Sequence, residues 1–135
     1  MKKRTKIIIA LLVIVAVSVG LYFLLSKKSN NAELYNKVLF RIRGVTYGKG
    51  LKLRGIVSVC RSGKIVLGEN VTIQSCRYAN PLGERCVFEI QKGASLCVGN
   101  NVGISCSVFK AEKEILIEDD VMVGAGCMVM DTDSH

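Results

Sequence analysis

The sequence predicts an all-β domain, a parallel β-helix, that follows one N-terminal transmembrane helix. Two observations carry this prediction: residues 7–25 are apolar and uncharged, and six-residue units with a shared pattern recur from Leu67 to Val129. A third observation is that Gly recurs every few residues from Val45 onward, while helical periodicity is absent. The chain has 135 residues, which is enough for one modest domain and an appendage.

The apolar segment IIIALLVIVAVSVGLYFLL, residues 7–25, is long enough to cross a membrane. As a helix it spans roughly 28 Å, close to the thickness of a bilayer's hydrocarbon core. The competing interpretation is a cleaved signal peptide, whose apolar part is shorter and ends at a small-x-small cleavage site. Here the apolar run continues through LYFLL, past the one such site, AVS. We therefore expect a retained anchor after the basic residues 1–6.

The charges are divided unevenly along the chain. Residues 1–64 contain 14 Lys/Arg and one acid, whereas residues 65–135 contain 5 Lys/Arg and 10 acids. The basic half adjoins the anchor and few aromatic residues interleave with it, which favours membrane lipids over nucleic acid as its partner. Basic residues flank the anchor almost equally. The longer basic stretch after it predicts a single-pass protein of the inner (plasma) membrane with a cytoplasmic domain.

The six cysteines show neither CxxC pairs nor zinc-ligand spacing. Most of them lie among Val, Leu and Ile, which is typical of small buried side chains in a reducing compartment. This also favours the cytoplasm, and we expect no metal.

Residues 26–44 form the expected connection between the anchor and the domain. SKKSNN predicts a polar linker, and AELYNKVLFR predicts a short helix with four apolar residues on one face, Leu34, Tyr35, Val38 and Leu39. Two interpretations stay open: an amphipathic helix that lies on the membrane, or a cap over the end of the following domain.

The six-residue units become visible when they are aligned on an aliphatic first residue. Three segments align in this way: LGENVTI from Leu67, VGNNVGI from Val98 and IEDDVMV from Ile117. In a parallel β-helix each unit supplies one short strand and one turn, and three units close a coil of about 18 residues. The first residue points inward, and the fifth is small because the corner is tight. The spacing of 19 between Val98 and Ile117 therefore fits one coil plus one residue.

The longer spacing of 31 between Leu67 and Val98 predicts an insertion. The segment CRYANPLGERC, residues 76–86, is the expected loop and contains the only proline of the chain. An ordinary sandwich or barrel would show longer runs of strict alternation. We therefore expect the β-helix to occupy residues 45–135, in about five coils.

The segments NPLGERC, LCVGNNVGIS and ILIEDDVMVGAGCMVMDTDSH, together with the anchor, resemble the hexapeptide-repeat acyltransferases. More specifically, they are similar to bacterial O-acetyltransferases that modify capsular, lipopolysaccharide or exopolysaccharide sugars. The resemblance implies a left-handed β-helix and a homotrimer with active sites between subunits. It also implies transfer of an acetyl group from acetyl-CoA to a hydroxyl of a cell-surface polysaccharide or its sugar precursor.

In this family a histidine at the place of His135 is the general base, so the resemblance gives His135 that role. It would remove the proton from the acceptor hydroxyl, which attacks the thioester carbonyl of acetyl-CoA. An imidazole suits this task because it binds and releases protons near neutral pH. The resemblance implies direct transfer without an acyl-enzyme, and a backbone N–H is the expected donor to the oxyanion.

Five further residues are weaker candidates for substrate binding. Asp131 and Asp133 could orient the imidazole or form a turn, and we favour the turn. Ser105 loosely matches a polar substrate-binding residue of the relatives, and is otherwise a turn serine. Asn80 and Arg85 could contact a sugar, although a solvated loop is the simpler interpretation.

Relatives continue for several coils after this histidine, and those coils form much of the acetyl-CoA groove. We therefore expect this chain to be an N-terminal fragment with weak or no activity of its own. Two other functions stay open: a membrane-anchored β-helix scaffold without catalysis, and an acyltransferase for a small acceptor such as serine. A zinc carbonic anhydrase of this fold needs three histidines, and the chain has one.

Overall fold

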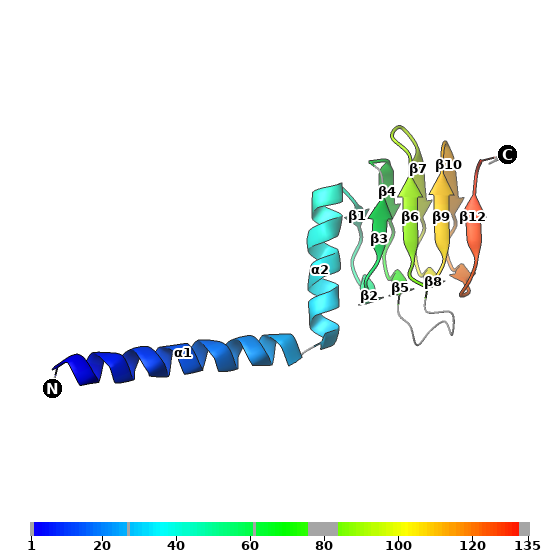
Figure 1. Cartoon of the computed structure of the whole chain (residues 1–135). Helices are drawn as coiled ribbons and strands as arrows, with labels where there is room; N and C mark the ends of the chain where they lie inside the picture. Colours follow the sequence, from blue (N-terminus) through cyan, green and yellow to red (C-terminus); the bar gives the residue numbers. More distant parts are fainter. Residues whose placement is uncertain (1, 27, 61, 76–83, 133–135) are drawn as a thin grey trace. The chain divides into compact units, whose positions relative to one another are not determined.

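The computed structural model describes residues 2–26, 28–60, 62–75 and 84–132. The chain divides into two compact units, Met1–Asn31 and Ala32–His135. The first unit contains helix α1, Lys2–Ser26. The second contains most of helix α2, Lys28–Arg43, and all the described strands (Figure 1).

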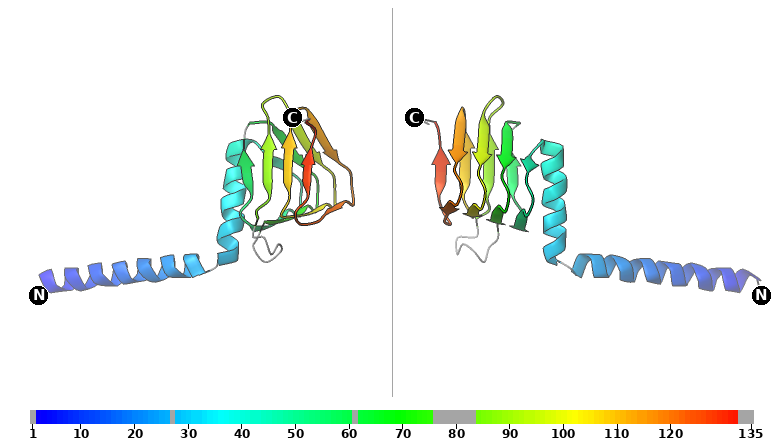
Figure 2. Two further views of the ribbon diagram at one scale, coloured as in Figure 1. Left: turned by 45° about the vertical axis from the view of Figure 1, so that its right-hand side comes forward. Right: turned by 180° about the vertical axis from the view of Figure 1, so that it is seen from behind.

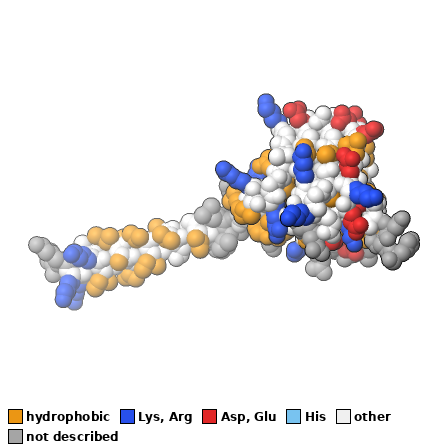
Figure 3. Space-filling view, turned by 90° about the horizontal axis from the view of Figure 1, so that it is seen from above, with side chains coloured by type: hydrophobic (Ala, Val, Ile, Leu, Met, Phe, Trp, Pro, Cys, Tyr) orange, Lys and Arg blue, Asp and Glu red, His pale blue; other side chains and the backbone are white. Residues whose placement is uncertain are grey.

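Helix α1 is apolar on every side. Its segment Lys3–Leu21 has a mean hydropathy of 2.2 and is, in the described part of the chain, the one helix long and apolar enough to cross a membrane. Figure 3 shows hydrophobic side chains along the helix and basic side chains at its N-terminal end. A helix that is apolar all round requires an apolar environment. The predicted helix is thus confirmed in length and hydropathy, and its crossing of the plasma membrane stays a prediction.

The second unit is built from three parallel sheets of four strands each. Sheet A contains β1 (Thr46–Tyr47), β4 (Lys64–Leu67), β7 (Ser95–Val98) and β10 (Glu114–Ile117). Sheet B contains β2 (Lys52–Gly55), β5 (Thr72–Ser75), β8 (Gly103–Ser105) and β11 (Met122–Val123). Sheet C contains β3 (Ser58–Cys60), β6 (Val87–Ile90), β9 (Val108–Ala111) and β12 (Met128–Met130). The chain visits the sheets in turn, so each strand pairs with the strand three places earlier (Figures 1 and 2).

The register of sheet A confirms the alignment of the six-residue units. Leu67 pairs with Val98, and Val98 pairs with Ile117, although the two sequence spacings differ. The extra residues fall between the end of β5 at Ser75 and the start of β6 at Val87, where the inserted loop was expected. The β-helix-like arrangement is therefore confirmed, while its left-handed sense and about five coils stay predictions.

The core consists of stacked side chains that point inward from each sheet. In sheet B, Ile73 pairs with Ile104, and both side chains are almost completely buried. In sheet C, Phe88 and Phe109 are paired and fully buried. Alternation within the strands from β2 to β10 places every second residue inside, as expected for the pleat of a β-strand. The predicted small corner residues are also buried, at Val71 and Val102.

Asn and Asp stand at the corners between sheets A and B, where the backbone turns sharply. Asn70, Asn101 and Asp120 have φ angles of 53°, 57° and 59°. Asn and Asp tolerate this left-handed conformation better than other residues with side chains. The Asn70 side-chain amide donates to Asn101, and the Asn101 amide donates to Asp120, at 3.3 and 3.0 Å. The corners are therefore linked by a ladder of side-chain hydrogen bonds.

One face of α2 caps the first strands of the stack. Phe40 is fully buried in the core, and its backbone C=O accepts a hydrogen bond from Val45 N–H. Asn36 is also fully buried; its side-chain amide donates to Gly55 O at 2.7 Å and accepts from Val57 N–H at 3.1 Å. Helix α2 therefore caps the stack, but through a different face from the apolar one of the sequence analysis, whose Leu34, Tyr35 and Val38 are exposed.

The helix is longer than the sequence suggests. Residues 28–31, expected to belong to a polar linker, form the first turn of α2. A helix that is already fixed by packing can be extended at a low cost in free energy. Each added residue gains a hydrogen bond, and the unfavourable nucleation step is not repeated.

Candidate functional site

A shallow groove of about 310 Å³ lies on the outer face of sheet B. Ile73 and Ile104 point into the core, so their neighbours on β5 and β8 point outward. The side chains that face the groove are polar apart from Met122, and the buried Val102 and Ile104 form part of its floor. The lining residues are Asn70, Thr72, Gln74, Asn101, Val102, Gly103, Ile104, Ser105 and Met122. The side chains of Thr72, Gln74 and Ser105 have no hydrogen-bond partner among the described residues. They can therefore bind hydroxyl or amide groups of a ligand.

Two cations continue the same outer face on the neighbouring strand β2. Lys52 pairs with Thr72, and Arg54 pairs with Gln74, and both basic side chains are exposed. Adjacent strands lie about 4.8 Å apart. The groove therefore combines neutral hydrogen-bonding groups with positive charge beside it, a combination that suits a polar ligand with phosphate groups.

The groove contains no general base of its own. Among the described residues that line it, none is Asp, Glu, His, Lys, Arg or Cys. Ser105 lies in this groove as the last residue of β8, so it is a strand residue and not the turn serine of the alternative interpretation. The sequence-based match of Ser105 to a binding residue is compatible with this position.

Asp131 lies elsewhere, at the corner between sheets C and A. One carboxylate oxygen accepts a hydrogen bond from Glu112 N–H at 2.7 Å, and the other accepts from Lys113 N–H and Glu114 N–H at 2.7 and 2.6 Å. These hydrogen bonds, led by that of Glu112, hold the pKa of Asp131 below its ordinary value. The geometry supports the turn role that we favoured, because both oxygens are used by the backbone.

Asp131→Asn is expected to change the pH dependence of stability. Because the folded-state pKa is lowered, the carboxylate stabilises the fold above the unfolded pKa of about 3.9, and this contribution disappears as the pH falls through the lower folded value. The melting temperature of the wild type should therefore exceed that of Asp131→Asn above about pH 5, and the difference should shrink below about pH 4. Thermal melts of the detergent-solubilised chain across this range measure it.

Glu118→Gln is the matched control for this prediction. Glu118 is exposed and has no hydrogen bond to its carboxylate within the described part of the chain. Its melting curve should follow the wild type at every pH. A difference between the wild type and Asp131→Asn that does not change with pH would contradict the assigned role.

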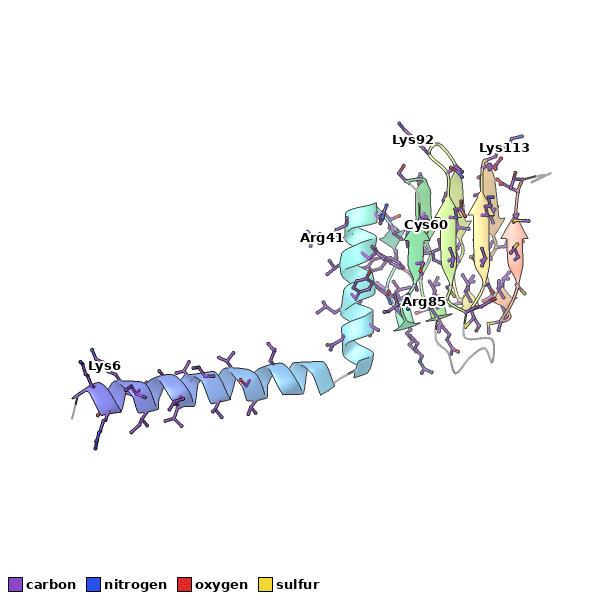
Figure 4. The ribbon with its side chains drawn as sticks, viewed as in Figure 1. Lys6, Arg41, Cys60, Arg85, Lys92 and Lys113 are labelled. Carbon is purple, nitrogen blue, oxygen red and sulfur yellow. The ribbon has the colours of Figure 1, made fainter. Side chains whose placement is uncertain are left out.

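Of the remaining predicted residues, only Arg85 is described by the structure. Arg85 is exposed just before β6 and does not line the groove (Figure 4). Asn80, Asp133 and His135 lie outside the described residues. Ser105 lies in the groove on sheet B, whereas Asp131 follows the last strand of sheet C. The structure therefore separates Ser105 from Asp131.

Of the five cysteines that the structure describes, two are buried, one is half-buried and two are exposed, whereas most were expected to be buried. Cys86 and Cys106 are buried, and each Sγ lies 3.4 Å from Gln74 O. Burial raises the pKa of the Cys86 thiol. Cys60 is exposed because it points outward from β3. Cys127 is exposed although its equivalents in the preceding coils, Cys86 and Ser107, are buried, because no described coil covers it.

Sequence reasoning missed most of the groove. The signal was present, because the alignment of the six-residue units already places Thr72, Gly103 and Met122 at equivalent outward positions. No pattern, however, distinguishes an outward neutral residue that binds a ligand from one that only contacts solvent.

The fold and the groove define a class of protein: a β-helix-like domain with a polar surface groove, preceded in sequence by an apolar helix. No protein-family model, curated protein or solved structure matches the chain. Within residues 2–26, 28–60, 62–75 and 84–132, no group of three or more His, Cys, Asp or Glu could hold a metal ion.

Proposed function

We propose that this protein is a membrane-anchored O-acetyltransferase of the hexapeptide-repeat type. It moves an acetyl group from acetyl-CoA to a hydroxyl of a cell-surface polysaccharide or its sugar precursor. The observation that carries the proposal is the stacking of aliphatic six-residue units in register across three parallel sheets. This repeat is the basis of the resemblance to that family, and it supports a left-handed β-helix with an enzyme's groove on its surface.

The groove and the cations beside it offer groups that can bind both the sugar acceptor and acetyl-CoA. Thr72, Gln74 and Ser105 offer hydroxyl and amide groups that can bind the hydroxyls of a sugar. Lys52 and Arg54, on the same outer face, offer positive charge to the phosphates of acetyl-CoA. These residues bind and orient the reactants but cannot move a proton at neutral pH.

His135 supplies the proton transfer in this proposal. It takes the proton of the acceptor hydroxyl while the hydroxyl oxygen bonds to the thioester carbonyl carbon. The carbon–sulfur bond then breaks, and the CoA sulfur leaves with the proton that the imidazole returns. In a homotrimer with sites between subunits, the groove of one chain meets the C-terminal segment of its neighbour. This arrangement accounts for a groove that lacks a base of its own.

The test is transfer of radiolabelled acetyl from acetyl-CoA in membranes of cells that express the protein from its own gene. Label is expected in purified surface polysaccharide and not in free serine. Ser105→Ala should lower the transfer about 5–10-fold, the effect of one lost hydrogen bond to substrate. Ser95→Ala is the matched control, since Ser95 lies on sheet A and does not line the groove. Label in serine would replace the proposal with a small acceptor, and no label in any acceptor would favour the scaffold.

A further inference from the structure

Helix α2 has a second apolar face, which the core does not use. Leu34, Tyr35, Val38 and Ile42 are exposed by 64, 53, 50 and 75 %. At roughly 100° per residue, these four side chains share one arc of the helix, and the buried Asn36 and Phe40 lie on the opposite side. Exposure of this arc to water is unfavourable, because burying four large apolar side chains would lower the free energy.

A hollow of about 470 Å³ adjoins this face, between α2 and β1. Leu34, Val38, Val45 and Tyr47 supply its apolar lining, and Lys37 and Arg41 supply its charges. The two basic residues are one helical turn apart, and Figure 4 shows Arg41 on the side of α2 away from the strands. A site with apolar walls and two cations suits an amphipathic anion.

Lys37 is held in place by a neighbour. Its ammonium lies 2.7 Å from the Glu33 carboxylate, and this hydrogen bond raises the pKa of Lys37. Arg41 forms no ion pair within the described part of the chain. One cation of the pair is thus free to bind an external anion.

The distribution of charge over the second unit favours a negatively charged surface as the partner. Strands stack in chain order, so the uneven charge along the sequence becomes a gradient along the stack. The α2 end carries basic residues, among them Lys37, Arg41 and Lys49, and the last strands and turns carry the acidic cluster Glu118–Asp120. Figure 3 shows basic and hydrophobic side chains gathered toward the α2 side and acidic ones toward the other.

Few residues connect the apolar helix to this face. Helix α1 ends at Ser26, and Leu34 follows eight residues later. Eight residues can reach at most about 28 Å, even if fully extended. If α1 lies in a bilayer, the surface of that bilayer is therefore within reach of α2.

We propose that the outer face of α2 lies in the headgroup layer of the membrane that holds α1, and that it binds anionic phospholipid there. We call this the α2 lipid face and define it by Leu34, Tyr35, Lys37, Val38, Arg41 and Ile42. The apolar side chains enter the boundary of the acyl chains, Arg41 binds a lipid phosphate, and Lys37 adds positive charge beside it. The contact holds the β-helix against the membrane by its α2 end. This inference requires the anchor but not acetyl transfer.

The absence of tryptophan allows a direct test. Leu34→Trp places one fluorescent reporter on the α2 lipid face, and Leu116→Trp places the control on β10, where Leu116 is 66 % exposed. Each full chain is placed in nanodiscs of phosphatidylcholine with phosphatidylglycerol, with lipids brominated near the headgroup as quenchers. The Leu34→Trp emission should be blue-shifted and quenched, and the Leu116→Trp emission should be neither.

Charge reversal tests the lipid headgroup. Lys37→Glu with Arg41→Glu, in the Leu34→Trp chain, should reduce the quenching by half or more in nanodiscs that contain phosphatidylglycerol. Lys92→Glu with Lys113→Glu is the matched control at distant turns and should leave the quenching unchanged (Figure 4). Equal, water-like emission from both reporters would overturn the proposal. A blue shift without bromine quenching, lost when chains are diluted among nanodiscs, would overturn it in favour of a second copy of the chain.

Discussion

Phe88→Ala and Phe109→Ala are each expected to lower the free energy of unfolding of the second unit by about 3–5 kcal/mol. Both side chains are fully buried and pair directly across β6 and β9. Their rings meet edge to face, with centroids 5.6 Å apart and an interplanar angle of 64°. Each truncation therefore removes a large buried apolar area and leaves a cavity that neighbouring strands, fixed by their ladder hydrogen bonds, cannot close.

Urea unfolding of the detergent-solubilised chain, followed by circular dichroism, measures these losses. Leu116→Ala is the matched control, because Leu116 is 66 % exposed and should cost less than about 0.5 kcal/mol. The double variant Phe88→Ala with Phe109→Ala should be less destabilised than the sum of the two single variants, by about 0.5–1.5 kcal/mol. If Phe109→Ala lowered the free energy of unfolding by no more than Leu116→Ala does, the assignment of Phe109 to the stacked core would be wrong.

The repeat could be predicted from the sequence because its physics is local. An aliphatic residue at a fixed place in each unit must stack on its equivalents, so the alignment of Leu67, Val98 and Ile117 predicts their pairing. The same alignment locates the insertion after β5. The strands of a solenoid contact mainly the neighbouring coils, so sequence order largely determines which strands meet.

The role of α2 could not be predicted in the same way. The most apolar arc of the helix contains Leu34, Tyr35 and Val38, and the sequence left open whether this arc contacts the membrane or caps the domain. The core instead packs against the arc with Asn36 and Phe40. Asn36 satisfies two backbone groups at the end of the stack, a need that exists only after the strands have been assembled. Local hydropathy therefore identified a real apolar face, but it could not show that the core would use the opposite face of the helix.

The candidate site shows the same limit. Ser105 was selected by the family resemblance and Asp131 by its closeness to His135 in the sequence, yet Ser105 and Asp131 lie on different sides of the stack. Asp131 binds three backbone N–H groups, a role that depends on the turn of a neighbouring coil. Ser105 joins a groove because residues from three strands and two corners converge there. Neither environment is encoded within a few residues of the side chain.

His135→Asn is expected to lower the rate of acetyl transfer by roughly 10²–10⁴-fold, the usual contribution of a positioned general base. Asparagine keeps a polar side chain of similar reach but cannot accept the proton of the attacking hydroxyl. The change should appear in kcat more than in KM, since binding in the proposal belongs to the groove. Initial rates with surface polysaccharide and radiolabelled acetyl-CoA, at equal protein levels in the membrane, measure it.

Two controls separate catalysis by His135 from a structural effect. His135→Ala with added imidazole should regain part of the lost rate, because a free imidazole can occupy the vacated space and accept the proton. Ser105→Ala should instead raise KM more than it lowers kcat, and added imidazole should not restore its activity. A His135→Asn chain that acetylates polysaccharide at the wild-type rate would leave the β-helix without a base. The fold, the groove and the anchor would then support a membrane-anchored scaffold that binds a polar ligand without transforming it.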